Sequence, residues 1–203
     1  MGVLRLQPPA EYPVSIEDVC DSLRLEDDEG DRFIERLIAA ATRTVEQKTQ
    51  RALVSQKWEF IIDGFPGSAN CDGTFLKKNS AIISLPLPPL ISVESIKYID
   101  VNGVEQTISP ADYVANFSSF LGGVYPAYGK AWPSARNQPQ AVRIAFTAGY
   151  GDAADVEPDL SLAIALLVGH YNENREASSD RQVYEIPLGV DRLIAPYIVP
   201  SAP

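Results

Sequence analysis

The spacing of hydrophobic residues changes twice along the chain. Over residues 15–25 and 32–51 they recur every three or four positions, which predicts two helices. Ser15 precedes the first helix and Asp18 follows three positions later, so both side chains can cap the helix start. We expect Ser15 to mark the first ordered element of the chain.

From residue 52 to residue 151 the period of the pattern is two, which is typical of strands that bury one face. Strands are predicted at residues 58–62 and 81–85, separated by a long loop at 65–80 that is rich in Gly, Ser, Asn and Asp. A hairpin is predicted at residues 92–108, because Asn102 and Gly103 favour a tight turn. Shorter strands follow within residues 113–125 and at 142–146.

Helical spacing returns at Pro158, a residue type favoured at the first helical position. Residues 160–171 are apolar on nearly all sides, which predicts a buried helix with partners from the chain itself or from a neighbouring subunit. A short helical turn at 190–193 precedes a proline-rich tail.

These patterns predict an α+β fold in one domain, residues 1–203. Helices from both ends of the chain, at 15–51 and 157–195, would pack together around a mainly antiparallel β insertion at 52–151. We expect the tail at 196–203 to be extended.

Composition excludes several classes of protein. The 203 residues include 17 Lys and Arg against 27 Asp and Glu, a net charge of -10, which argues against tight binding of nucleic acid or anionic membrane through bulk charge. No apolar run approaches the ~20 residues that span a bilayer, and residues 1–12 lack a signal-peptide pattern. Cys20 and Cys71 are two thiols or one disulfide, and with a single histidine they cannot form a closed zinc site.

Few residues point to catalysis. The chain has no phosphate-binding loop, dinucleotide-binding glycine motif, nucleophile elbow or zinc-protease motif. The sole histidine, His170, falls late in the apolar helix, where the negative end of the helix dipole gives it a structural role. Asp152 and Asp155 precede a helix, where carboxylates act as caps. The alternative is a small hydrolase or carbohydrate-binding enzyme that uses this pair.

Two further clusters have a structural and a functional interpretation. The acidic run at residues 26–29 is typical of a solvated loop, the alternative being a cation site. Four aromatic residues lie among Gly and Pro, and either pack a loop onto the sheet or form a stacking groove for a sugar or base. They are Tyr125, Tyr128, Trp132 and Tyr150. We expect no cofactor and no bound metal.

Several separate stretches together resemble one family. They are residues 15–25, 37–53, Leu-Pro-Leu-Pro-Pro-Leu at 85–90, then Val93, Ile96, Tyr98, Asp100 and Gly103, residues 127–133, Phe-Thr-Ala-Gly-Tyr-Gly at 146–151, Pro158, residues 166–170 and 173–176, Ile-Pro-Leu-Gly-Val at 186–190, and Leu193. In this order they resemble the head–tail connector proteins of tailed bacteriophages, also called adaptor or head-completion proteins. The resemblance covers about residues 15–197, and the family also occurs in prophages and gene transfer agents.

The resemblance implies a structural virion protein rather than an enzyme. Such connectors form a ring of about twelve subunits that joins the portal to the tail and continues the DNA channel. The implied partners are the portal protein, a stopper or other tail-proximal neck protein, and further copies of the chain. Genomic DNA would pass through without specific binding, and no membrane is involved. The implied location is the virion neck, assembled in the cytoplasm of a bacterial host. Another neck component, such as a stopper or tail terminator, is the alternative within the virion.

Three groups of residues become candidates under this interpretation. The portal-contacting tail would use Leu193, Tyr197, Ile198 and Val199, unless the terminus is untethered. The inter-subunit or core helix would use Leu162, Leu166 and His170. The channel-facing acids would be Glu26, Asp27, Asp28 and Glu29. Residues 15–50 carry ten acids and five bases, so this part of the chain could repel DNA phosphates and let DNA slide.

Overall fold

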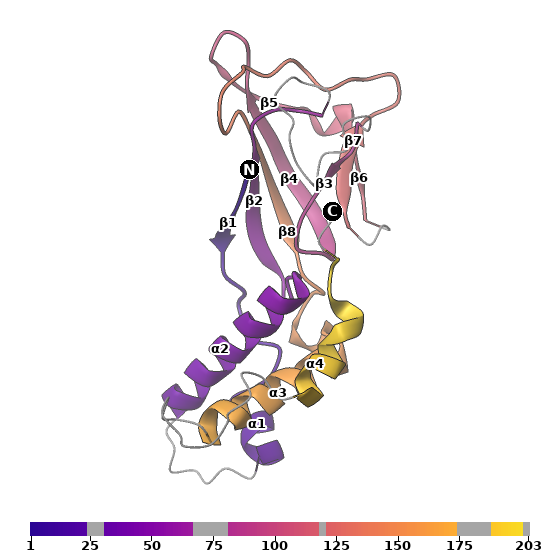
Figure 1. Cartoon of the computed structure of the whole chain (residues 1–203). Coiled ribbons are helices and arrows are strands. Elements are labelled where there is room, and N and C mark those ends of the chain that lie inside the picture. The colour runs from indigo at the N-terminus through magenta and orange to yellow at the C-terminus, as the bar shows by residue number, and fades with distance from the viewer. Residues whose placement is uncertain (24–30, 67–80, 118–120, 174–187, 201–203) are drawn as a thin grey trace. The chain divides into compact units, whose positions relative to one another are not determined.

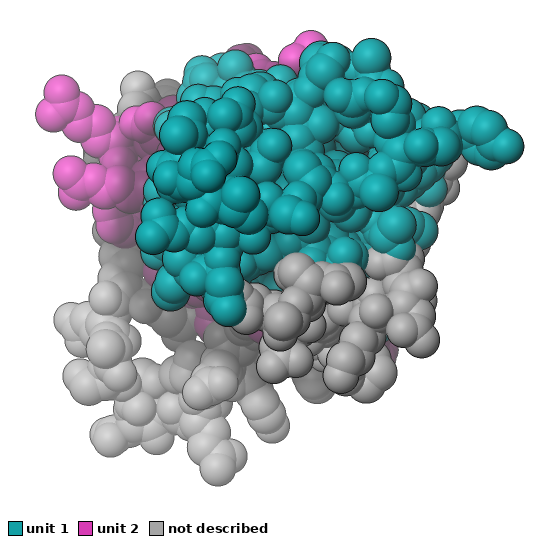
Figure 2. All heavy atoms as spheres, turned by 90° about the horizontal axis from the view of Figure 1, so that it is seen from above, with its two compact units in different colours: residues 1–10, 55–150, 200–203 teal, residues 11–54, 151–199 magenta. Residues whose placement is uncertain are grey.

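The computed structural model describes residues 1–23, 31–66, 81–117, 121–173 and 188–200 (Figure 1). The chain divides into two compact units, one of residues 1–10, 55–150 and 200–203 and the other of residues 11–54 and 151–199 (Figure 2). Helices occupy one unit and antiparallel sheets the other, which confirms the predicted α+β class. The organisation as a single connector domain stays a prediction.

The helical unit contains segments from both ends of the chain. Its elements in the described residues are α1 (Ile16–Leu23), α2 (Asp31–Thr49), α3 (Pro158–Glu173) and α4 (Leu188–Ile194), with short 3-10 turns at Ala153–Asp155 and Ala195–Tyr197. The Ser15 hydroxyl accepts a hydrogen bond from the Asp18 amide at 3.0 Å and donates one to the Asp18 carboxylate at 2.7 Å, which confirms the predicted cap. None of the helices in the described segments has the length and hydropathy needed to cross a bilayer.

The α2 helix contributes one apolar face to the core of this unit. Ile34, Ile38, Ala41 and Val45 are spaced by four, three and four positions and are almost fully buried. The same helix packs against α3, and α3 packs against α4. Burying one Leu or Ile side chain contributes about 1.5–3 kcal/mol, so burial of this shared face stabilises the unit.

The other unit consists of antiparallel sheets. In the described residues the larger sheet has the strand order β1 (Gly2–Gln7), β2 (Gln56–Ile62), β8 (Val142–Ala148), β4 (Leu90–Ile99) and β5 (Glu105–Thr107). A smaller sheet has the order β3 (Ile83–Ser84), β7 (Gly123–Pro126) and β6 (Tyr113–Asn116). Part of the predicted 65–80 loop, residues 67–80, lies outside the described residues.

Alternation along β8 fixes the register of the larger sheet. Its buried residues Ile144 and Phe146 alternate with exposed Arg143, and Ile144 lies opposite Phe60 of β2 and Ile96 of β4. A shift of one residue would move this apolar set to the solvent face, so the register is strongly specified.

The predicted hairpin at 92–108 is confirmed as β4 and β5, and Asp100 organises its turn. The Asp100 carboxylate accepts hydrogen bonds from the Asn102 and Val104 amides at 2.9 and 3.0 Å and from the Gln106 side chain at 3.2 Å. These bonds, above all that from Val104, lower the pKa of Asp100. Gly103 has a φ of 85°, a conformation that favours glycine.

The prediction that Ser15 marks the first ordered element is wrong, because β1 precedes it. All six residues of β1 are exposed, and its main-chain pairing with β2 runs from Gly2 opposite Ile61 to Gln7 opposite Lys57. A strand whose side chains are all exposed does not need alternating hydrophobic and polar residues. The alternation that predicts the other strands therefore gives no prediction for β1.

Candidate functional site

The outer face of α3 carries two exposed leucines one helical turn apart. Leu162 is 50% exposed and Leu166 is 40% exposed, whereas Ile164 and Leu167 on the opposite face are fully buried. Within the described residues the chain therefore buries one face of the predicted helix, and cover of the other face by a neighbouring subunit stays a prediction. In the described part of the chain, the two leucines on the other face of α3 thus stay about half exposed.

His170 lies one further turn along the same row of α3. It is half-buried, and its ring centroid is 6.1 Å from that of Tyr171. The Tyr171 hydroxyl lies 3.2 Å from the Thr44 hydroxyl of α2, and Thr44 also donates to the Ala40 carbonyl at 2.9 Å. This polar contact fixes the end of α3 against α2, so the Leu162–Leu166–His170 row has a defined orientation.

The C-terminal segment is tied to the end of α2. The Arg51 guanidinium, in a residue only 9% exposed, donates from Nε to the Tyr197 carbonyl at 2.6 Å. The Val199 amide donates to the Thr49 carbonyl at 2.9 Å, and the Tyr197 hydroxyl lies 3.2 Å from an Asp159 carboxylate oxygen. Through Val199 the segment is therefore anchored rather than untethered.

A short turn overlaps the first two residues of the predicted extended tail at 196–203, and the extended form of the whole tail stays a prediction. Residues Ala195–Tyr197 form a 3-10 turn, and residues 201–203 lie outside the described part of the chain. Leu193 on α4 and Val199 are half-buried, whereas Ile198 is 43% exposed. Of the four predicted tail contacts, Ile198 thus has the largest exposed fraction.

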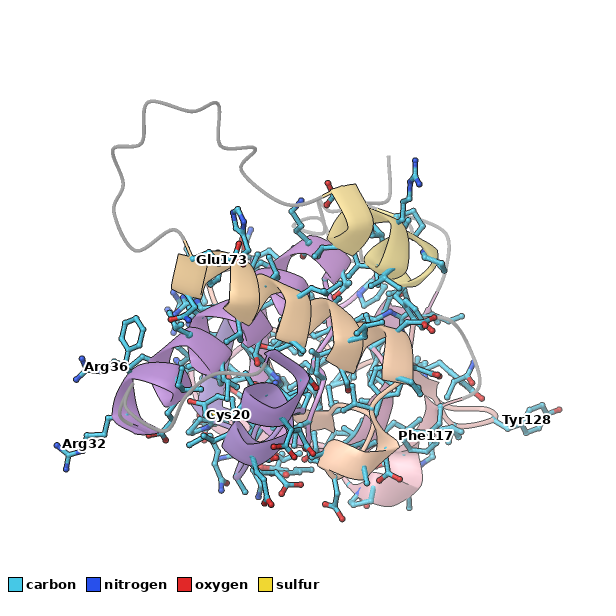
Figure 3. All side chains as sticks on the ribbon, turned by 90° about the horizontal axis from the view of Figure 1, so that it is seen from below. Cys20, Arg32, Arg36, Phe117, Tyr128 and Glu173 are labelled. Carbon is cyan, nitrogen blue, oxygen red and sulfur yellow. The ribbon has the colours of Figure 1, made fainter. Side chains whose placement is uncertain are left out.

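The four predicted channel-facing acids, Glu26 to Glu29, lie outside the described residues. The elements on either side carry both signs of charge: Glu17 and Asp18 are exposed on α1, and Arg32 and Arg36 are exposed on α2. Figure 3 shows the two arginine side chains pointing away from the helix. The described neighbours of the acidic run are therefore mixed in charge.

Asp152 and Asp155 organise a turn. The Asp155 carboxylate accepts a hydrogen bond from the Asp152 amide at 3.1 Å, and the Asp155 amide donates to the Asp152 carbonyl at 3.1 Å. Glu11 reaches the same turn and accepts from the Ala153 amide at 2.7 Å. The pair thus caps the 3-10 turn at Ala153–Asp155 rather than α3 itself. In the described segments no group of three or more His, Cys, Asp or Glu residues is arranged to hold a metal ion.

The predicted aromatic groove does not form as a unit. Trp132 stacks on Phe65 with ring centroids 5.1 Å apart, and its indole donates to the Ala81 carbonyl at 2.6 Å. Tyr128 is fully exposed at the end of its loop and points away from it (Figure 3). A cavity of about 300 Å³ next to Trp132 is lined by Tyr98, Thr107, Ile108, Ser109, Asp112, Lys130, Ala131, Trp132 and Pro133. Of the four aromatics, only Trp132 lines this cavity, so packing of the loop onto the sheet is the role the contacts support.

Two features of the described chain carry no signal in the local spacing of the sequence. The exposed strand β1 has no alternation of buried residues, as described above. The bond from Arg51 to the Tyr197 carbonyl is the other feature, because local spacing in the sequence cannot reveal a partner 146 positions later.

Comparison with known proteins first establishes a class of fold. No protein-family model matches the chain, and no curated protein matches it. Solved structures do match it over nearly its whole length, across both the helical and the β unit. Their sequence identity to this chain is 21–23%, and the similarity shows a common fold.

These structures come from gene transfer agent particles. A chain from the neck of an empty particle, computed with C6 symmetry, has a TM-score of 0.75 and 22% identity to this chain. A chain from the virion of the native particle has a TM-score of 0.75 and 23% identity, and one from the native neck computed with C12 symmetry has 0.72 and 21%. Each alignment covers 98% of this chain and 95% of the other.

Proposed function

We propose that this chain is a structural protein of the virion neck that joins the DNA-filled head to the tail. The observation that carries the proposal is the fold shared with gene transfer agent neck chains over 98% of this chain and 95% of theirs. Coverage on both sides means that the fold is shared over nearly the whole length of both chains rather than in one common module, which supports the proposal. The ordered motifs that resemble head–tail connectors support the same function independently of the fold.

The proposed working form is a homo-oligomeric ring of about twelve copies. Necks computed with C6 and C12 symmetry support such an arrangement. A ring requires two different complementary faces on each subunit. Leu162, Leu166 and His170 on the open face of α3 would form one of these faces, since the two leucines find no cover within the described chain.

The proposed partners are the portal protein on the head side and a stopper or similar neck protein on the tail side. The segment with Leu193, Tyr197, Ile198 and Val199 would contact the portal, with exposed Ile198 at its centre. Because Arg51 and Thr49 already hold this segment, docking would cost little conformational entropy.

The proposed function needs no catalysis. Asp152 and Asp155 bond to each other's main chain in a turn, which supports a structural rather than a hydrolytic role. DNA would pass through the ring without specific binding, and the net charge of -10 would limit adhesion of phosphates to it.

Deletion of the gene tests the proposal. We expect DNA-filled or leaking heads and separate tails, with joined particles lost, as counted by electron microscopy of lysates. The cause would be the missing ring between portal and tail. Normal joined particles from the deletion strain would contradict the proposal.

Complementation supplies the matched control. A copy with Asp152→Asn and Asp155→Asn should restore joined particles as well as the natural gene, because asparagine keeps an acceptor oxygen for the turn. Failure of this variant with normal folding would favour the enzymatic alternative.

A further inference from the structure

The larger sheet has two strand edges that no described residue pairs with. β1 pairs with β2 alone at one end of the strand order, and β5 pairs with β4 alone at the other end. The outer main-chain amides and carbonyls of an edge strand form a template for another strand. The two edges belong to the same sheet, so each copy of the chain carries both.

The β1 edge is regular from Gly2 to Arg5, and its register with β2 shifts only between Arg5 and Gln7. Val3, Leu4 and Leu6 are 44%, 53% and 50% exposed, and the strand contains neither proline nor lysine. Its single charged residue is Arg5, whose guanidinium lies 5.9 Å from the centroid of the Trp58 ring. An exposed apolar strand with one positive charge is therefore available for pairing.

The β5 edge is complementary in chemistry. All of Glu105–Thr107 is exposed, and Val104 immediately before it is 54% exposed. The charged residue of this strand is Glu105, opposite in sign to Arg5. Glu105 lies 3.4 Å from Lys97 with half of its side chain exposed, so it can still attract a second cation.

We propose that the β1 edge of one copy pairs with the β5 edge of the next copy, so that the sheet continues across the subunit boundary. The inference rests on the proposed function for its setting, a ring of identical subunits. Pairing of two different edges is heterologous and repeats from copy to copy, whereas pairing of β1 with a second β1 would stop at a dimer. The opposite charges of Arg5 and Glu105 favour the first arrangement over the second, which would bring two like charges near each other on short strands.

Cysteine cross-linking tests this pairing. Leu4→Cys and Thr107→Cys place one thiol on each edge, at positions that are exposed in the chain. After mild oxidation, the double variant should give a ladder of species beyond the dimer on a non-reducing gel. The full chain is tested both as a concentrated purified protein and in purified particles. The matched control is Leu4→Cys with Val101→Cys, because Val101 is 65% exposed but precedes β5 in the hairpin turn. The unmodified chain measures the background from Cys20 and Cys71.

The outcomes separate this inference from the proposed function. A ladder in the double variant and none in the control supports edge pairing. If the purified protein gives a ladder but is absent from the necks of purified particles, edge pairing is supported and the proposed neck function is overturned. Particles that contain the protein but give only monomer or dimer would keep the neck function and overturn edge pairing. The absence of a ladder in both preparations would also overturn edge pairing.

Discussion

A chain with Leu162→Glu and Leu166→Lys is expected to fold normally and to fail in assembly. Both positions are about half exposed, and surface substitutions change the free energy of unfolding by roughly 0.5 kcal/mol or less. Glu four positions before Lys is a favourable helix pair of about 0.2–0.5 kcal/mol, and the net charge of the chain is unchanged. In the assembled ring the same charges would be buried against an apolar partner. A cost of about 3 kcal/mol for burying these charges in the subunit contact corresponds to a roughly hundredfold weaker association of the subunits.

The measurement combines denaturant unfolding with a count of joined particles from the complemented deletion strain. Leu167→Ala is the matched control on the buried face of α3, because truncating a fully buried leucine lowers the free energy of unfolding by about 2–5 kcal/mol. The double variant should lose joined particles with unchanged stability. If it instead restored joined particles to the natural number, the open face of α3 would not be a subunit contact.

Arg51→Met is expected to destabilise the helical unit and release the C-terminal segment. Methionine keeps the apolar stem but removes the donor to the Tyr197 carbonyl, 2.6 Å away in a nearly buried setting. Hydrogen bonds to charged groups contribute about 1.5–3 kcal/mol, so the free energy of unfolding should fall by that order. Hydrogen exchange at the Val199 amide, which donates to the Thr49 carbonyl, should become faster.

Lys48→Met gives the contrast on the same stretch of chain. Lys48 pairs with Asp191 at 2.8 Å, but the two side chains are 38% and 47% exposed, and such pairs contribute about 0–1 kcal/mol. Hydrogen exchange at the Val199 amide of the Lys48→Met variant should match that of the natural chain. Equal effects of the two substitutions would show that Arg51 does not anchor the segment.

The regular elements could be predicted where local spacing and burial coincide. The α2 helix was predictable because its buried residues recur every three or four positions, and β8 because they alternate. The strand β1 could not be predicted in this way, because its side chains are all exposed and its main chain does the pairing.

The candidate site was predictable only in part, for two physical reasons. Residues 160–171 are apolar on nearly all sides, so the sequence indicates a helix that needs partners but does not show that Leu162 and Leu166 are the uncovered ones. The Arg51 to Tyr197 contact joins residues 146 positions apart, which local spacing cannot reveal. The spacing patterns nevertheless predicted the α+β class of the chain, and the neck structures share its fold.

The most direct test of the central claim is a reconstruction of the neck of particles from the producing strain by electron cryo-microscopy. The account predicts a closed ring of copies of this chain between the portal and the tail, with each copy in the fold described above. A neck whose density is fully explained by other chains, with no ring of this one, would contradict it.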